Sequence, residues 1–135
     1  MKHEILYTEE EISEVIDIIA MSLDKMLEGE KVILMPILKG GLFFGIDLAR
    51  RMKTELVGFD IIGWKSYNDD QAQGVFEQTG TPTEYLPGKK IVLVDDILDS
   101  GATMKRTIKY LKHNNKVDTD DIIDREIGHM DMEWT

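Results

Sequence analysis

Apolar positions along this 135-residue chain form two patterns, helical repeats and short continuous runs. Between residues 12 and 27 they recur every three or four positions, as on one face of a helix. Thr8 and Glu11 match a capping box, which predicts that the helix begins after Thr8. Gly29 predicts the end of the same helix.

The rest of the chain alternates between apolar runs and further helical repeats. The runs predict strands, and the repeats predict helices. Strands are predicted at about 32–37, 55–64 and 91–95, with a short last strand at 117–123, and helices at about 42–52 and 103–114. This alternation favours an α/β fold, with a mostly parallel twisted sheet flanked by helices. We find no repeat or linker, so residues 1–135 are expected to form one domain.

Composition narrows the classes of partner. A net charge of −10 argues against nucleic acid and anionic membranes as partners. No apolar run approaches the roughly 20 residues that span a bilayer, and the first ten residues lack the apolar core of a signal peptide. The absence of cysteine excludes disulfides and thiol chemistry. We therefore expect a cytoplasmic protein that binds neither nucleic acid nor membranes.

The segment from Ile91 to Thr103, IVLVDDILDSGAT, combines an apolar run with acids and a hydroxyl-rich turn. It is expected to run from the carboxyl end of a strand to the amino end of a helix, where free amides suit a phosphate. Asp95 and Asp96 would repel a phosphate unless they hold a ribose diol or hydrated Mg²⁺. Asp99 lies close enough in sequence to act as a general base on the same ligand.

This segment resembles the phosphoribosyl-pyrophosphate (PRPP) loop of the type I phosphoribosyltransferases, most closely the hypoxanthine-guanine group. The resemblance implies that Asp95 and Asp96 hold the ribose hydroxyls and, through water, the Mg²⁺ ion. It implies that Asp99 lies near the purine N7 as the catalytic base, with Ile97 beside the base. The 5′-phosphate would be bound by Ser100, Gly101, Ala102 and Thr103.

Two further segments agree with the resemblance. Leu38, Lys39 and Gly40 match the pyrophosphate-binding loop, which in the family usually starts with a non-proline cis peptide. Ser66 and Tyr67 match the Ser-Tyr pair of a lid that closes over the ribose and pyrophosphate and excludes water. The lid is expected at about residues 65–80.

The resemblance covers a core of about residues 8–115, and the tail 116–135 departs from it. Family members continue with a strand, a base-reading lysine and a hood that stacks on the base. Here the hood is abbreviated. Arg125 falls near the position of the lysine, and Trp134 could stack on a purine, which is worth roughly 1–3 kcal/mol. A frayed acidic tail is the alternative interpretation of both residues.

Together these patterns favour a purine-salvage enzyme. It would transfer the phosphoribosyl group of PRPP to hypoxanthine or guanine, with Mg²⁺ as cofactor, giving IMP or GMP and pyrophosphate. Two alternatives stay open. One is a transferase for another base, either xanthine or a pyrimidine. The other is a non-catalytic regulatory protein that binds PRPP or a nucleotide. The family usually forms homodimers or homotetramers, and the same is expected here.

Overall fold

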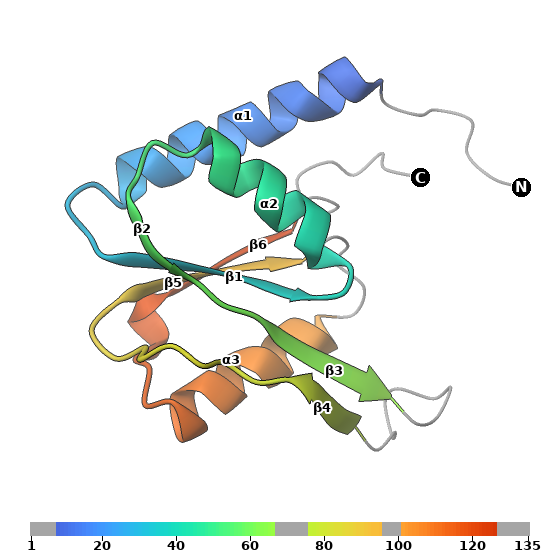
Figure 1. Ribbon diagram of the computed structural model, residues 1–135, viewed down its shortest axis with the longest axis vertical. Helices are drawn as coiled ribbons and strands as arrows, with labels where there is room; N and C mark the ends of the chain where they lie inside the picture. Colours follow the sequence, from blue (N-terminus) through green and yellow to red (C-terminus); the bar gives the residue numbers. More distant parts are fainter. Residues whose placement is uncertain (1–7, 67–75, 96–100, 127–135) are drawn as a thin grey trace, which may run out of the picture.

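A six-stranded sheet lies at the centre of the protein, seen in a computed structural model that describes residues 8–66, 76–95 and 101–126 (Figure 1). The strands follow the order β4-β3-β1-β5-β6, and β2 pairs with β1 as well. Only the β3–β4 pair is antiparallel among the strands of these ranges. The strands are β1 (Val32–Leu38), β2 (Leu56–Phe59), β3 (Ile62–Ser66), β4 (Phe76–Gly80), β5 (Lys90–Asp95) and β6 (Ile122–Glu126). The predicted α/β class with a mostly parallel sheet is confirmed.

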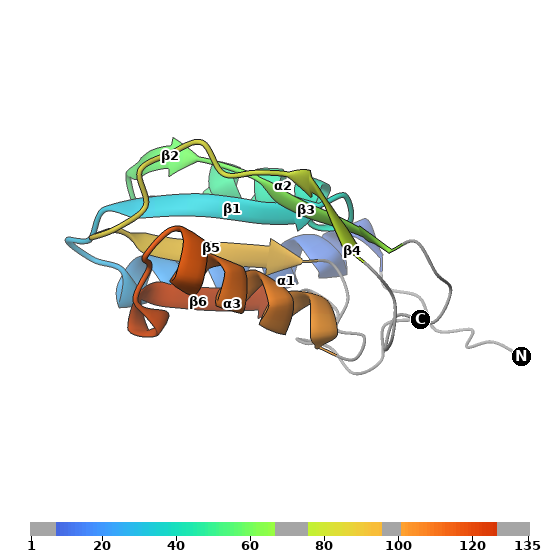
Figure 2. The same cartoon turned by 90° about the horizontal axis from the view of Figure 1, so that it is seen from below.

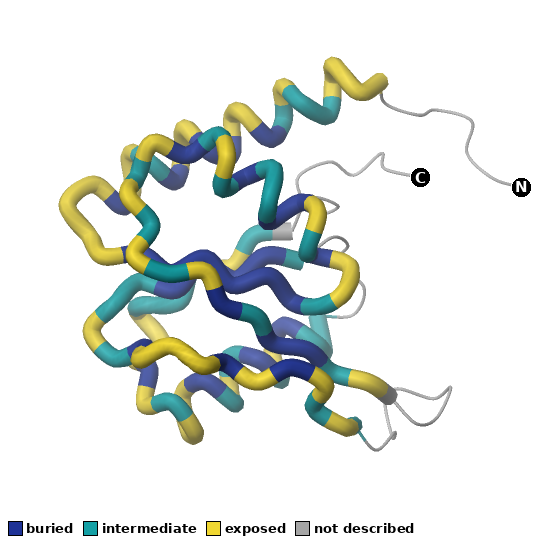
Figure 3. Tube along the Cα trace, viewed as in Figure 1, coloured by how far each residue is buried: buried dark blue, intermediate teal, exposed yellow. Residues whose placement is uncertain are grey.

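Helices cover both faces of this sheet. Figure 2 shows α3 (Ala102–Asn114) on one side of the strands and α1 (Glu9–Met26) with α2 (Gly41–Arg51) on the other. The central strands are dark blue in Figure 3 because they are buried on both faces. Along β1, Val32 and Leu34 pack with the α1/α2 side, whereas Ile33 and Met35 pack with the α3 side. Because β1 is buried on both faces, its sequence is a continuous apolar run.

The capping box predicted for α1 is present. Thr8 Oγ1 accepts a hydrogen bond from the Glu11 amide at 3.0 Å, and Glu11 Oε1 accepts one from the Thr8 amide at 2.8 Å. The helix ends at Met26, slightly before the predicted end. Gly29 adopts a φ of +81° in the following turn, a conformation that favours glycine.

One predicted strand is in fact two. The run 55–64 is interrupted at Asp60, whose buried carboxylate accepts hydrogen bonds from the amides of Ile61, Thr83 and Glu84 at 2.8–3.1 Å. The Asp60 amide itself donates to the Leu34 carbonyl at 2.9 Å. These bonds turn the chain between β2 and β3 and fix the segment that precedes β5.

Two other boundaries differ from the prediction. Of the loop expected at 65–80, the first two residues belong to β3 and the last five form β4, which pairs with β3. The last strand begins at Ile122 rather than Val117, because Val117 is buried in the core beneath α3 and Thr119–Asp121 forms a 3-10 turn. None of the helices in the described ranges is long and apolar enough to cross a bilayer.

We expect Asp60→Ala to lower the free energy of unfolding by about 2 kcal/mol, because the three amides lose a charged acceptor. Urea denaturation at neutral pH measures this change. Asp17→Ala is the matched control, since Asp17 only forms a surface ion pair with Arg51 at 2.8 Å. A loss for Asp60→Ala no larger than that of the control would contradict the assigned role.

Candidate functional site

The carboxyl ends of β1 and β5 lie next to each other at one edge of the sheet. The two strands are parallel, with Pro36 opposite Val94, so their carboxyl ends lie side by side (Figure 1). Gly41, at the start of α2, packs directly on the end of β5. A Cβ at this position would overlap the carbonyl oxygen of Val94, so only glycine allows this approach. The turn after β1 is thereby held beside Asp95.

The turn after β1 carries the predicted pyrophosphate-binding residues. Leu38 ends the strand, and the Leu38–Lys39 peptide bond is cis, the feature that the family resemblance implied. Lys39 and Gly40 are exposed, and the Lys39 carbonyl accepts a hydrogen bond from the Leu42 amide at 3.1 Å. Gly40 is the N-cap of α2. An exposed lysine at the amino end of a helix suits an anion.

The predicted PRPP loop is described at its two ends. Asp95 is the partly buried last residue of β5. Gly101 is the N-cap of α3 with a φ of +81°, and Ala102 and Thr103 form the first turn of that helix. The loop thus runs from a strand's carboxyl end to a helix's amino end, the placement that suits a phosphate. The predicted residues Asp96, Ile97, Asp99 and Ser100 lie outside the described residues.

The residues predicted to cover the site begin at the end of β3. Gly63 lies opposite Leu38, the last residue of β1, so β3 continues three residues past that strand. Ser66 pairs with Phe76 of β4. Ser66 is therefore at the same edge as the two loops, and Tyr67 lies outside the described residues.

On the other side of β5, the strand β6 brings Arg125 to this edge. Arg125 pairs with Val94, and its Nη1 donates to the carbonyl of Asp124 at 2.8 Å. The residue is partly buried. The edge that carries the predicted loops therefore also carries the residue predicted to read the base. Trp134 lies outside the described residues.

The sequence did not reveal how β3 and β4 contact α3. Trp64 donates a hydrogen bond from Nε1 to Thr107 Oγ1 at 2.9 Å, and Arg106 lies over the ring of Phe76. The partners in these contacts are 43 and 30 positions apart along the chain, so no local spacing signals them. The helical period of α3 places Thr107 on the buried face of that helix. This period could have indicated that Thr107 is buried, but not that its partner is Trp64.

Two carboxylates at this edge are expected to hold a metal ion. The structure describes Asp95, and Asp96 lies outside the described residues. Among the described residues, no group of three or more His, Cys, Asp or Glu side chains is arranged to hold a metal ion. One or two carboxylates are nevertheless enough for Mg²⁺ when water and a substrate phosphate complete its shell. The donors expected at this edge therefore fit Mg²⁺ rather than a metal held entirely by protein.

Comparisons with known proteins identify the family that the chain matches. A family model described as a phosphoribosyl transferase domain matches residues 2–117. Hypoxanthine-guanine phosphoribosyltransferase of Dictyostelium discoideum is 29% identical over 119 residues, covering 85% of this chain and 66% of the relative. The enzyme of that name from Staphylococcus aureus strain N315 is 29% identical over 121 residues, covering 89% and 66%. The chain thus spans just under two thirds of these relatives.

Solved phosphoribosyltransferase structures have a similar fold. A hypoxanthine-guanine phosphoribosyltransferase from Bacillus anthracis, with HEPES in its active site, superposes with a TM-score of 0.78 at 25% identity, covering 93% of this chain and 73% of that one. A hypoxanthine phosphoribosyltransferase from Staphylococcus aureus gives 0.75 at 27% identity, covering 91% and 65%.

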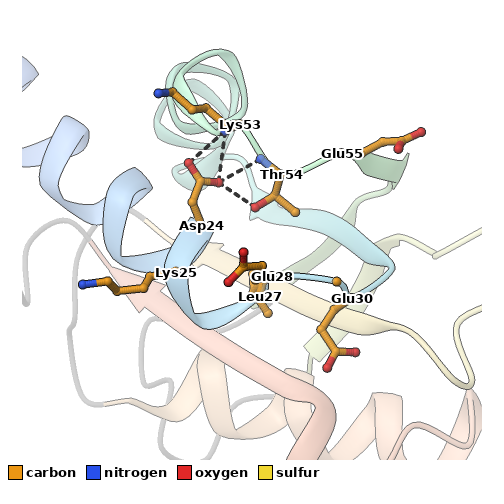
Figure 4. A pocket seen from close by; sticks show the side chains of 9 residues that line it. Asp24, Lys25, Leu27, Glu28, Glu30, Lys53, Thr54 and Glu55 are labelled. Carbon is orange, nitrogen blue, oxygen red and sulfur yellow. Dashed lines mark hydrogen bonds between the residues drawn. The ribbon is translucent and has the colours of Figure 1, made fainter.

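A hollow of about 650 Å³ lies at the opposite edge of the sheet (Figure 4). It is formed where α1 ends and where the chain enters β1 and β2, so it faces the amino ends of these strands. Its charged side chains are mostly acidic, which disfavours a phosphorylated ligand. They are Asp24, Lys25, Glu28, Glu30, Lys53 and Glu55.

Asp24 ties α1 to the segment that enters β2. Its carboxylate accepts hydrogen bonds from the amides of Lys53 and Thr54 and from Thr54 Oγ1, at 2.6–3.0 Å (Figure 4). Burial alone would raise the pKa of Asp24. The hydrogen bond from the Thr54 hydroxyl, those from the two amides and the charge of Lys53 outweigh it, so the pKa lies below its ordinary value.

Since the pKa of Asp24 is lowered on folding, its carboxylate stabilises the fold above the ordinary pKa of 3.8, and this contribution is lost as the pH falls through the folded-state pKa. We expect Asp24→Asn to be less stable than the wild type at pH 7, with the difference shrinking below pH 3.8. Urea denaturation at several pH values measures it. A difference that stays constant down to about pH 3 would rule out the ionised carboxylate as its source. Thr54→Val, which removes one donor, should show a smaller effect of the same sign.

Proposed function

Because the chain belongs to the phosphoribosyl transferase domain family, we propose that it transfers the phosphoribosyl group of PRPP to a 6-oxopurine, hypoxanthine or guanine. The products are IMP or GMP and pyrophosphate. The observation that carries this proposal is the packing of Gly41 on Val94, which holds the turn after β1 beside the end of β5. Two anion-binding turns, at the starts of α2 and α3, thus serve one edge of the sheet, as a ligand that carries phosphate at two positions requires.

Each part of PRPP has a place at this edge. The first turn of α3 receives the 5′-phosphate, through the backbone and hydroxyls of Ser100, Gly101, Ala102 and Thr103. The turn after β1 receives the pyrophosphate, through the backbone of Leu38, Lys39 and Gly40 and the charge of the lysine. Between the two turns, Asp95 and Asp96 accept hydrogen bonds from the ribose hydroxyls.

The reaction exchanges one bond at the anomeric carbon for another. The bond from C1′ to pyrophosphate breaks and its electron pair leaves with the pyrophosphate, while purine N9 forms the new bond to C1′. The purine loses a proton at N7, which Asp99 accepts as general base. Ser66 and Tyr67 cover the ribose, because an oxocarbenium-like centre open to solvent would react with water.

Mg²⁺ fits the proposed donor set. When bound, it would neutralise negative charge on the pyrophosphate. Asp95 and Asp96 would hold its water shell, in keeping with the preference of Mg²⁺ for a few carboxylates, water and substrate oxygens. The acidic net charge makes such local neutralisation necessary for a polyanionic substrate.

The base is read beside β6. Arg125 is at the carboxyl edge next to Val94, so its guanidinium can donate to the exocyclic oxygen of a 6-oxopurine. Ile97 and Trp134 supply apolar contact and stacking on the ring. A homodimer or homotetramer would shield this side of the site from solvent.

The test of this proposal is a reaction with PRPP, Mg²⁺ and a pool of hypoxanthine, guanine, xanthine, adenine, uracil and orotate, with the nucleotides identified by mass spectrometry. The wild type should form IMP or GMP. In the same assay Asp99→Ala should lower kcat by about 100-fold or more, because it removes the general base, and leave the Kd of PRPP within a few-fold of wild type.

The matched control is Asp120→Ala, which removes an exposed carboxylate in the 3-10 turn before β6, away from the carboxyl ends of the strands. It should leave kcat and the Kd of PRPP unchanged. If the nucleotide formed contains another base, that base is the substrate instead of hypoxanthine or guanine. Binding of PRPP without any product would favour a regulatory protein, and equal losses of kcat and PRPP affinity in Asp99→Ala would refute the general-base role.

A further inference from the structure

A buried hydroxyl connects the β3–β4 pair to the start of α3. Thr107 is completely buried, and its Oγ1 makes two hydrogen bonds in opposite senses. It accepts from Trp64 Nε1 at 2.9 Å and donates to the carbonyl of Thr103 at 2.8 Å. The single hydroxyl proton of Thr107 is thus donated within α3, and a lone pair of the same oxygen accepts the indole N–H of Trp64 on β3.

Ring contacts strengthen the same junction. The guanidinium carbon of Arg106 lies 3.4 Å from the ring centroid of Phe76 on β4 and 6.0 Å from that of Trp64. The ring of Tyr110 meets Trp64 edge-on, with centroids 5.6 Å apart. Arg106 Nε is buried without a hydrogen-bond partner among the described residues. Stacking on the aromatic rings therefore accounts for the position of this side chain better than hydrogen bonding of Nε does.

The two ends of the hydrogen-bond chain lie in two different parts of the site. Thr103 belongs to the first turn of α3, which the proposed function assigns to the 5′-phosphate. Trp64 lies two residues before Ser66, which the same proposal assigns to the cover of the ribose. Because both bonds meet at one atom of Thr107, the position of one part depends on the position of the other.

We propose that Thr107 is a positioning residue that, through Trp64 and Thr103, holds the phosphate-binding turn of α3 in register with the end of β3. The assignment rests on the proposed function. A phosphate held by several amides requires all of them at hydrogen-bond distance at once, so a small displacement of the first turn weakens binding. Loss of the Thr107 hydroxyl should therefore lower the affinity for PRPP and leave the later chemical step intact.

The test uses variants that keep shape and remove one polar atom. Thr107→Val lacks the hydroxyl, and Trp64→Phe lacks the indole N–H. Trp64→Phe should raise the KM and Kd of PRPP about fivefold, the effect of one net hydrogen bond. Thr107→Val loses both hydrogen bonds and should raise them at least as much. In each variant kcat should change less than about twofold. The double variant should be no weaker than the more affected single variant, because both changes remove the same bond. Thr107→Ser keeps the hydroxyl and should bind PRPP like the wild type.

Tyr110→Phe is the matched control, since it removes a hydroxyl from the same helix and keeps the ring against Trp64. It should bind PRPP with wild-type affinity. Calorimetric binding of PRPP and circular dichroism are recorded for every variant, so a loss of fold is separated from a loss of affinity. Should Thr107→Val fail to fold, the PRPP affinities of Trp64→Phe and Tyr110→Phe decide whether the Trp64–Thr107 bond positions the phosphate-binding turn.

Failure of this inference can be told apart from failure of the proposed function. If the wild type binds PRPP and the folded variants bind it equally well, Thr107 has no positioning role and the function stands. A fall in kcat as large as the fall in affinity would overturn the positioning role in the same way. If the wild type itself does not bind PRPP, the proposed function fails and the role assigned to Thr107 falls with it.

Discussion

The parallel pairing of β1 with β5 is the constraint on which the rest of the structure depends. Five residue pairs, from Val32–Lys90 to Pro36–Val94, fix the register, and the apolar side chains along both strands are buried. Because both strands run the same way, the segments that follow them must emerge at one edge. Gly41 then allows α2 to start in direct contact with β5. The candidate site is thus a consequence of how the core packs.

The opposite edge of the sheet has contacts that hold the elements together. Asp24 ties α1 to the entry of β2, and Lys90 pairs with Asp121 at 2.9 Å where β5 begins. The hydrogen bond to Asp121 outweighs desolvation and raises the pKa of Lys90. Asp24, Lys90 and Asp121 are thus partnered within the fold, whereas Lys39 and Gly40 at the carboxyl edge are exposed. The hollow of Figure 4 does not suit the proposed phosphorylated substrate, because its charged side chains are mostly acidic.

Local patterns predicted the parts of the fold that depend on neighbours in sequence. The capping box of α1, the buried runs of β1 and β5 and the start of α3 at a glycine turn all follow from short spacings. The break at Asp60 could not be predicted, since its carboxylate is satisfied by amides 23 and 24 residues away. The contact of Trp64 with Thr107 is equally remote in sequence. The strands and helices that carry the expected site residues were therefore predictable, whereas the contacts that hold these elements in register were not.

We propose that one edge of the sheet, at the carboxyl ends of β1 and β5, binds PRPP. Backbone amide chemical shifts, followed by NMR during titration with PRPP and Mg²⁺, test this most directly. If PRPP binds at this edge, we expect large, saturable shifts for Lys39, Gly40, Gly101, Ala102 and Thr103, with little change at Asp24 and Glu28. Saturable shifts concentrated around Asp24, or no saturable shifts at all, would contradict it.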